Sequence, residues 1–116
     1  MYIFAGPFAF AKSSANDFYV VVPVKGRVLG AMATGDVASI AAASTVSLKA
    51  SSHAINVMAF GASYSAGDVI AGTQNASYGD FMISAGGALN VHLAAAGVSG
   101  ATAMLTIDFD EFARTD

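Results

Sequence analysis

The residues best suited to chemistry are three carboxylates near the end of the chain, Asp108, Asp110 and Glu111. Asp108 and Asp110 are two positions apart, so an extended strand puts both on one face, where they could bind a hard cation such as calcium. The spacing lacks the Asp-x-Asp-x-Asp-Gly pattern that is typical of a calcium loop. We therefore interpret the cluster as a solvated outer face that also protects an edge strand, and we predict no metal ligands.

Two histidines, His53 and His92, are the next candidates for chemistry. Neither has a third ligand or a carboxylate partner close in sequence, and the chain has no cysteine, so a zinc site or a nucleophilic triad has little support. Two carboxylates for glycoside hydrolysis could be drawn from Asp36, Asp68 and Asp80, but these lie in turns beside glycine, where Asp ordinarily bonds the local backbone. We predict no catalytic residue, no cofactor and no enzymatic activity.

Two tyrosines are candidates for binding rather than for catalysis. Tyr64 and Tyr78 lie in adjacent predicted loops and could stack on sugar rings, or they could be ordinary contacts at a protein interface. The tripeptide Asn75-Ala76-Ser77 matches a glycosylation acceptor, but no secretory signal accompanies it. Both interpretations of the tyrosines stay open.

The composition of the chain argues against several classes of function. At 116 residues the chain has the size of one domain, and no apolar run approaches the ~20 residues of a membrane-spanning helix. A net charge of −3 with five scattered basic residues argues against a nucleic-acid partner. Only 11% of the residues are charged, so we expect much of the surface to be covered by copies of the chain or by a large partner.

Residues 17–34 organise the predicted fold. Their first half alternates in the manner of a strand and carries apolar residues on both faces, with Tyr19 and Val21 on the second face. Pro23 and the turn signal Lys25-Gly26 follow, and a second strand starts directly after them. We expect the first strand to be buried on both sides and the pair to form a hairpin or a corner at which the chain changes sheets.

Strand-like alternation recurs along the rest of the chain, at the spacing of a sandwich or barrel. Only residues 37–43 favour a helix, and that segment is short. The pattern is clearest in residues 102–110, where Leu105 and Ile107 face the core and Thr106 faces out. We predict an all-β, antiparallel β-sandwich of eight or nine short strands, formed as a single domain by residues 18–116.

Residues 1–17 precede this domain and form an N-terminal aromatic segment or arm. The segment lacks the basic start of a signal peptide and is interrupted by Gly6-Pro7. Aromatic residues occupy alternate positions on either side of that break: Tyr2, Phe4, Phe8 and Phe10. Either the segment is a strand that completes a sheet, or it packs on a neighbouring subunit, and we take its aromatic residues as candidate partner contacts.

Five motifs follow one another between residues 18 and 112. They are Pro23-Val24-Lys25-Gly26-Arg27-Val28, Val46-Ser47-Leu48, Ser65-Ala66-Gly67-Asp68, Gly86-Gly87-Ala88-Leu89-Asn90-Val91 and Ala103-Met104-Leu105-Thr106-Ile107. This order resembles the small jelly-roll decoration, or cement, proteins of tailed bacteriophages. The resemblance implies a virion protein that binds the exterior of an icosahedral capsid and stabilises it. The expected partner is the major capsid protein, and the expected oligomeric state is a homo-oligomer, with a trimer favoured. The alternative is a carbohydrate-binding or receptor-binding module that uses the loops of Tyr64 and Tyr78.

Overall fold

The computed structural model of the protein describes residues 1–11, 13–35, 44–50, 52–60, 67–77, 82–94 and 101–111. These ranges contain nine strands and no helix, and therefore no helix that could cross a membrane. The strands are β1 (Tyr2–Ala9), β2 (Asn16–Val21), β3 (Gly26–Gly35), β4 (Ser44–Ala50), β5 (His53–Phe60), β6 (Val69–Ala71), β7 (Thr73–Gln74), β8 (Ala88–Leu93) and β9 (Thr102–Glu111). The helix considered for residues 37–43 lies outside the described ranges.

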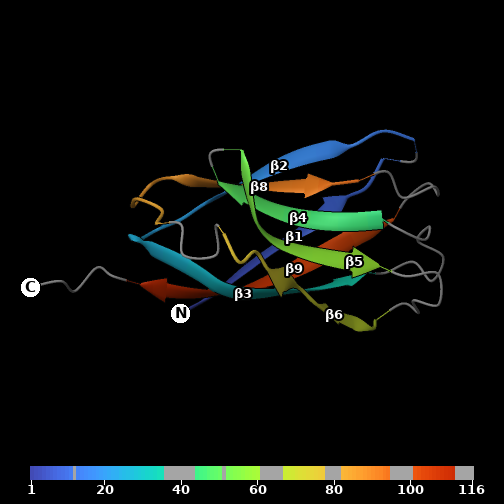
Figure 1. Cartoon of the computed structure of the whole chain (residues 1–116). Helices are drawn as coiled ribbons and strands as arrows, with labels where there is room; N and C mark the ends of the chain where they lie inside the picture. The colour runs from blue at the N-terminus through green and yellow to red at the C-terminus, as the bar shows by residue number, and fades with distance from the viewer. Residues whose placement is uncertain are drawn as a thin grey trace, which may run out of the picture.

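The strands form two antiparallel sheets that pack as a sandwich. One sheet has the order β1-β9-β3-β6 and the other the order β2-β8-β4-β5-β7. Figure 1 shows the two layers, with β2, β8 and β4 in one and β1, β9 and β3 in the other. The predicted all-β sandwich is confirmed.

The pairing of the strands is nested, as in a jelly roll. β4 pairs with β5, β3 with β6, β2 with β8 and β1 with β9, so the chain follows one long antiparallel ribbon that turns back between β4 and β5. Successive pairs of this ribbon lie alternately in the five-stranded and the four-stranded sheet. The wound ribbon is a jelly roll, with β7 added at the edge beside β5.

The organising segment is a corner at which the chain changes sheets. β2 belongs to the five-stranded sheet and β3 to the four-stranded sheet, and fully buried Val22 lies between them. The prediction that the first strand is buried on both sides is wrong, since Tyr19 and Val21 are 69% and 66% exposed. β2 is an edge strand, and within the described chain no layer covers the outer face of its sheet.

The core lies between the sheets and follows the predicted alternation. Leu89 and Leu93 of β8 point inward from the five-stranded sheet, and Leu105, Ile107 and Phe109 of β9 point inward from the other. All five side chains are at most 2% exposed. The intervening residues are half-buried or exposed, so the expected core face of residues 102–110 is confirmed.

The N-terminal segment completes the four-stranded sheet of its own chain. β1 pairs with β9 in antiparallel register, with an irregularity at the cis Gly6-Pro7 bond. The pairing extends to Met1, whose carbonyl oxygen accepts a hydrogen bond of 2.8 Å from the amide of Phe109. The segment therefore contributes the edge strand beside β9.

Two short pairings lie outside the nested ribbon. The two-residue strand β7 pairs with β5, with Gln74 opposite Asn56 and Thr73 opposite Val57. An isolated antiparallel bridge joins Ile83 to Gly26. That bridge ties the corner after β2 to the segment that precedes β8.

Candidate functional site

Asp108 and Asp110 lie on the outer face of β9, and Glu111 is the exposed last residue of that strand. Asp110 forms an ion pair with Arg27 of β3, with a distance of 3.5 Å between Nε and Oδ2. The described residues contain no group of three or more side chains that could hold a metal ion. The expectation that this cluster protects an edge strand is wrong, because β9 is an inner strand between β1 and β3.

Of the two histidines, His92 has a carboxylate partner. Its Nδ1 lies 2.7 Å from Oδ1 of Asp17, which precedes it by 75 residues. The two residues are far apart in the sequence, and only the pairing of β2 with β8 places Asp17 opposite His92, so the pair could not be predicted from the sequence. His53 begins β5 and does not lie in a turn, while Asp68 is an exposed residue just before β6. The two other candidate carboxylates, Asp36 and Asp80, lie outside the described ranges.

The candidate partner contacts fall into three groups. Tyr2 and Phe4 are 61% and 75% exposed on the outer face of β1. Phe8 and Phe10 are buried in the core, so they are not available to a partner of the folded chain. Tyr64 and Tyr78 lie outside the described ranges.

The outer face of the four-stranded sheet carries an apolar surface. Its register places Phe4 opposite Thr106, Thr106 opposite Met32, and Met104 opposite Thr34, which in turn lies opposite Val69. We call the four large side chains of this surface the apolar face: Phe4, Met32, Val69 and Met104. They line a shallow hollow of about 300 Å³ and are each at least 42% exposed.

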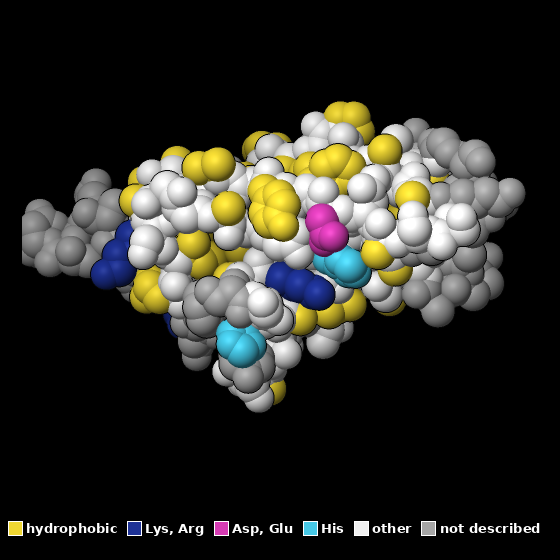
Figure 2. Space-filling model, turned by 90° about the horizontal axis from the view of Figure 1, so that it is seen from above, with side chains coloured by type: hydrophobic (Ala, Val, Ile, Leu, Met, Phe, Trp, Pro, Cys, Tyr) yellow, Lys and Arg dark blue, Asp and Glu magenta, His cyan; other side chains and the backbone are white. Residues whose placement is uncertain are grey.

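The outer face of the five-stranded sheet is different in character. The register aligns Asp17 with His92, and Tyr19 with Asn90 and Lys49, across the strands β2, β8 and β4. We call these five residues the polar face. Figure 2 shows this side of the molecule, where acidic, basic and histidine side chains lie together near the middle of a largely uncharged surface.

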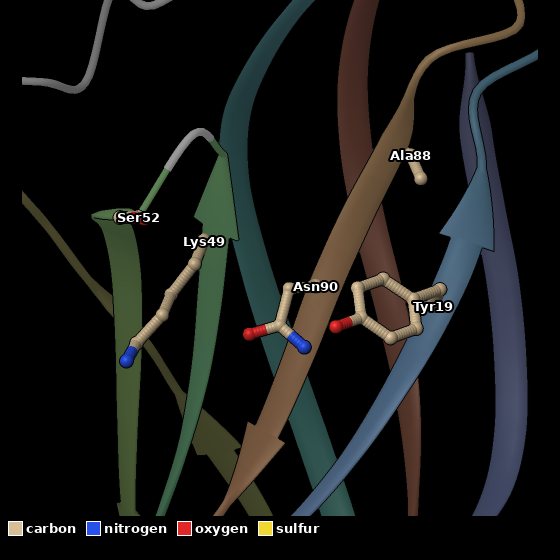
Figure 3. A pocket seen from close by; sticks show the side chains of 5 residues that line it. All are labelled: Tyr19, Lys49, Ser52, Ala88 and Asn90. Carbon is tan, nitrogen blue, oxygen red and sulfur yellow. The ribbon is translucent and has the colours of Figure 1, made fainter.

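Hydrogen bonds hold the side chains of the polar face in place. The Nδ2 of Asn90 donates to Oδ1 of Asp17 and to the carbonyl oxygen of Phe18, both at 3.2 Å. The bonds from His92 and Asn90 stabilise the carboxylate and lower the pKa of Asp17 below its ordinary value. Close to this network, Tyr19, Lys49, Asn90 and two small residues line a hollow of about 310 Å³, shown in Figure 3.

Comparisons with protein-family models, with curated proteins and with solved structures give no significant match to this chain. The features that bear on function are therefore these two surfaces and the jelly-roll fold that positions them. The sequence already held one signal for each surface. Alternation put Asn90 and His92 on an outer face and Phe4 on a face of the N-terminal strand, but only the strand order shows which side chains are neighbours.

Proposed function

We propose that the chain is a structural virion protein that binds the outside of an icosahedral capsid and stabilises the capsid lattice. The observation that carries the proposal is the apolar face, in which large side chains from four adjacent strands are exposed together. A contiguous exposed apolar patch usually marks a surface that another protein covers. The jelly roll is a fold found in capsid proteins, and the order of sequence motifs resembles that of phage decoration proteins.

The proposed partner of the apolar face is the major capsid protein. Within the described part of the chain, the lining of the central hollow contains no charged residue, so its burial against another protein would leave no ion unpaired. Phe4 and Val69 lie on the two edge strands of the sheet, so the patch spans its whole width. A capsid presents many equivalent sites, and modest contacts at each of them add up when decorating subunits are themselves linked.

The same proposal includes the oligomeric state and the location of the protein. We propose a homo-oligomer, preferably a trimer, located on the capsid exterior, with no enzymatic activity and no nucleic-acid or membrane partner. The low content of charged residues supports this, since a protein that remains free in solution ordinarily relies on surface charge to stay soluble. Light scattering on the purified chain measures the oligomeric state directly.

The test uses the chain together with the major capsid protein encoded in the same genome. After co-expression, sedimentation through a density gradient separates assembled shells from free subunits. We expect the chain to sediment with the shells, and we expect Phe4→Ser and Met104→Ser to release it. Val21→Ser is the matched control, because Val21 is equally apolar and 66% exposed but lies on the opposite sheet.

Two outcomes would contradict the proposal. Failure of the unmodified chain to sediment with shells would remove the capsid as partner. Equal release by Val21→Ser and Phe4→Ser would show that the apolar face is not the contact surface. Circular dichroism of each variant establishes that the β fold is intact before its binding is interpreted.

A further inference from the structure

The polar face offers a second, separate binding surface on the other side of the sandwich. Tyr19 is 69% exposed, and Figure 3 shows its ring lying along the sheet with one flat side turned outward. Asn90 lies beside the ring on β8, and Lys49 follows on β4. With neighbouring strands roughly 4.8 Å apart, these three side chains extend over about 10 Å of the surface.

We propose that the polar face binds a pyranose sugar without net charge. A sugar ring has flat patches of C–H groups, which fit the exposed side of an aromatic ring, and a rim of hydroxyl groups that both donate and accept hydrogen bonds. Tyr19 provides the apolar platform and lines, with Asn90 and Lys49, a hollow of about 310 Å³, the size of a small ligand site. Asp17 does not line the hollow; it lies in the next row of the register and is hydrogen-bonded to Asn90.

The polar atoms beside Tyr19 are held before any ligand arrives. A carboxylate only accepts hydrogen bonds, so the 2.7 Å contact requires the Nδ1 of His92 to donate to Asp17. Asn90 uses its amide hydrogens on Asp17 and on the carbonyl oxygen of Phe18. Among the described residues, this leaves Oδ2 of Asp17 and Oδ1 of Asn90 without a hydrogen bond, and both can accept from sugar hydroxyls. Because these side chains are already ordered, binding costs less conformational entropy.

The charges on the polar face favour a ligand without net charge. Asn90 lies opposite Lys49 in the register and donates a hydrogen bond to Asp17, so one positive and one negative side chain flank the same residue. An anionic ligand would be attracted to Lys49 but repelled by Asp17, and a cationic ligand would experience the reverse. Neutral hydroxyl groups can bond to both side chains. The ammonium of Lys49 donates, and the carboxylate of Asp17 accepts.

A small ligand also fits this surface better than a protein partner does. Stable protein interfaces bury roughly 800 Å² on each side around a core that is poor in charge. On the polar face, Asp17, Lys49 and His92 lie close to the one exposed aromatic ring. The inference does not depend on capsid binding, since the apolar face lies on the other sheet.

The test is a titration of the full chain, followed by nuclear magnetic resonance, with methyl α-glucopyranoside, methyl β-galactopyranoside, methyl α-mannopyranoside and maltose as probes. At least one of these sugars should shift the amide signals of Tyr19 and Asn90. Tyr19→Ala should weaken the binding at least tenfold, the factor that corresponds to about 1.4 kcal/mol of lost contact. Tyr19→Phe keeps the ring and should change the affinity by less than roughly threefold, and Val21→Ala, on the same face of β2, is the matched control.

Three outcomes would overturn the proposal. The first is that no probe binds at a concentration of about 10 mM. At that concentration, even a weak complex with a dissociation constant of about 1 mM, or about 4 kcal/mol of binding free energy, would be detected. The second is tighter binding of sialyllactose, an acidic sugar, that is lost in Lys49→Gln, which would make the ligand an anion. The third is a change of oligomeric state in Tyr19→Ala, which would make the polar face a protein interface.

Discussion

The ring of Phe8 packs against the ring of Phe18, with the ring centroids 5.1 Å apart and the planes inclined by 40°. Phe8 belongs to β1, an edge strand of the four-stranded sheet, and Phe18 belongs to β2, an edge strand of the five-stranded sheet. The pair therefore joins the two layers along a side where both sheets end. Within β1, Phe8 is 8% exposed and Phe4 is 75% exposed, so one strand serves both the core and the surface.

The first prediction concerns β1. Phe8→Ala should lower the free energy of unfolding by roughly 3–5 kcal/mol, because it removes a buried ring and leaves a cavity. Phe4→Ala, on the exposed side of the same strand, should change it by about 0.5 kcal/mol or less. Urea unfolding measures both values.

A chain without residues 1–11 should fail to fold cooperatively, since it loses Phe8, Phe10 and the partner strand of β9. A truncated chain that is stably folded would contradict this prediction.

The second prediction concerns the two faces of β9. Leu105→Ala should lower the unfolding free energy by roughly 2–5 kcal/mol, because it deletes methyl groups that are buried between the sheets and leaves a cavity. Thr106→Ala, on the outer face of the same strand, should cost far less. Chemical denaturation of the two variants in parallel gives the comparison. Equal losses would mean that the strand faces are assigned wrongly.

The third prediction concerns a buried amide network beside Gly72. The Nδ2 of Asn56 donates to Oε1 of Gln74 at 2.7 Å, and the Nε2 of Gln74 donates to the carbonyl oxygen of Val28 at 2.6 Å. A Cβ at residue 72 would collide with the side-chain oxygen of fully buried Asn56. Gly72→Ala should therefore destabilise the protein by about 1–3 kcal/mol.

Gly30 is the matched control for this substitution, because a Cβ there meets no atom within 4 Å. Gly30→Ala should leave the thermal midpoint unchanged or raise it slightly, since alanine restricts the unfolded chain. The melting temperatures of the two variants give the test. A midpoint for Gly72→Ala equal to that of Gly30→Ala would show that the amide network can move aside at no cost.

The fourth prediction concerns the stability of the protein at acidic pH. Hydrogen bonds from His92 and Asn90 lower the pKa of Asp17 below its ordinary value of 3.8. The carboxylate therefore stabilises the fold above that value, and the contribution is lost as the pH falls through the lower pKa of the folded chain. Asp17→Asn should make the unfolding free energy less dependent on pH between about 5 and about 2.

The pKa of Asp17 can also be followed directly through its carboxyl carbon by nuclear magnetic resonance. His92→Gln should move this pKa upward toward 3.8, because the hydrogen bond from His92 is the largest cause of the lowering. An unchanged pKa in that variant would show that the 2.7 Å contact does not form in solution.

The sequence by itself determined the fold class and most of the core. Alternation in residues 102–110 placed Leu105 and Ile107 inside, and the same period placed Leu89 and Leu93 inside, because a strand turns every second side chain to the same face. Residues in β2 show what alternation alone cannot predict. The apolar residues on both faces predicted a strand buried on two sides, yet Tyr19 and Val21 are exposed because no other layer of the described chain covers the outer face of their sheet.

Only the tertiary structure decided which distant residues are neighbours. Asp17 and His92 are 75 residues apart, and they meet because the nested ribbon pairs β2 with β8 in one particular register. The apolar face depends in the same way on the order β1-β9-β3-β6. Alternation is a local property of a strand, whereas strand order and register follow from packing the whole ribbon around one core, so no single segment carries them.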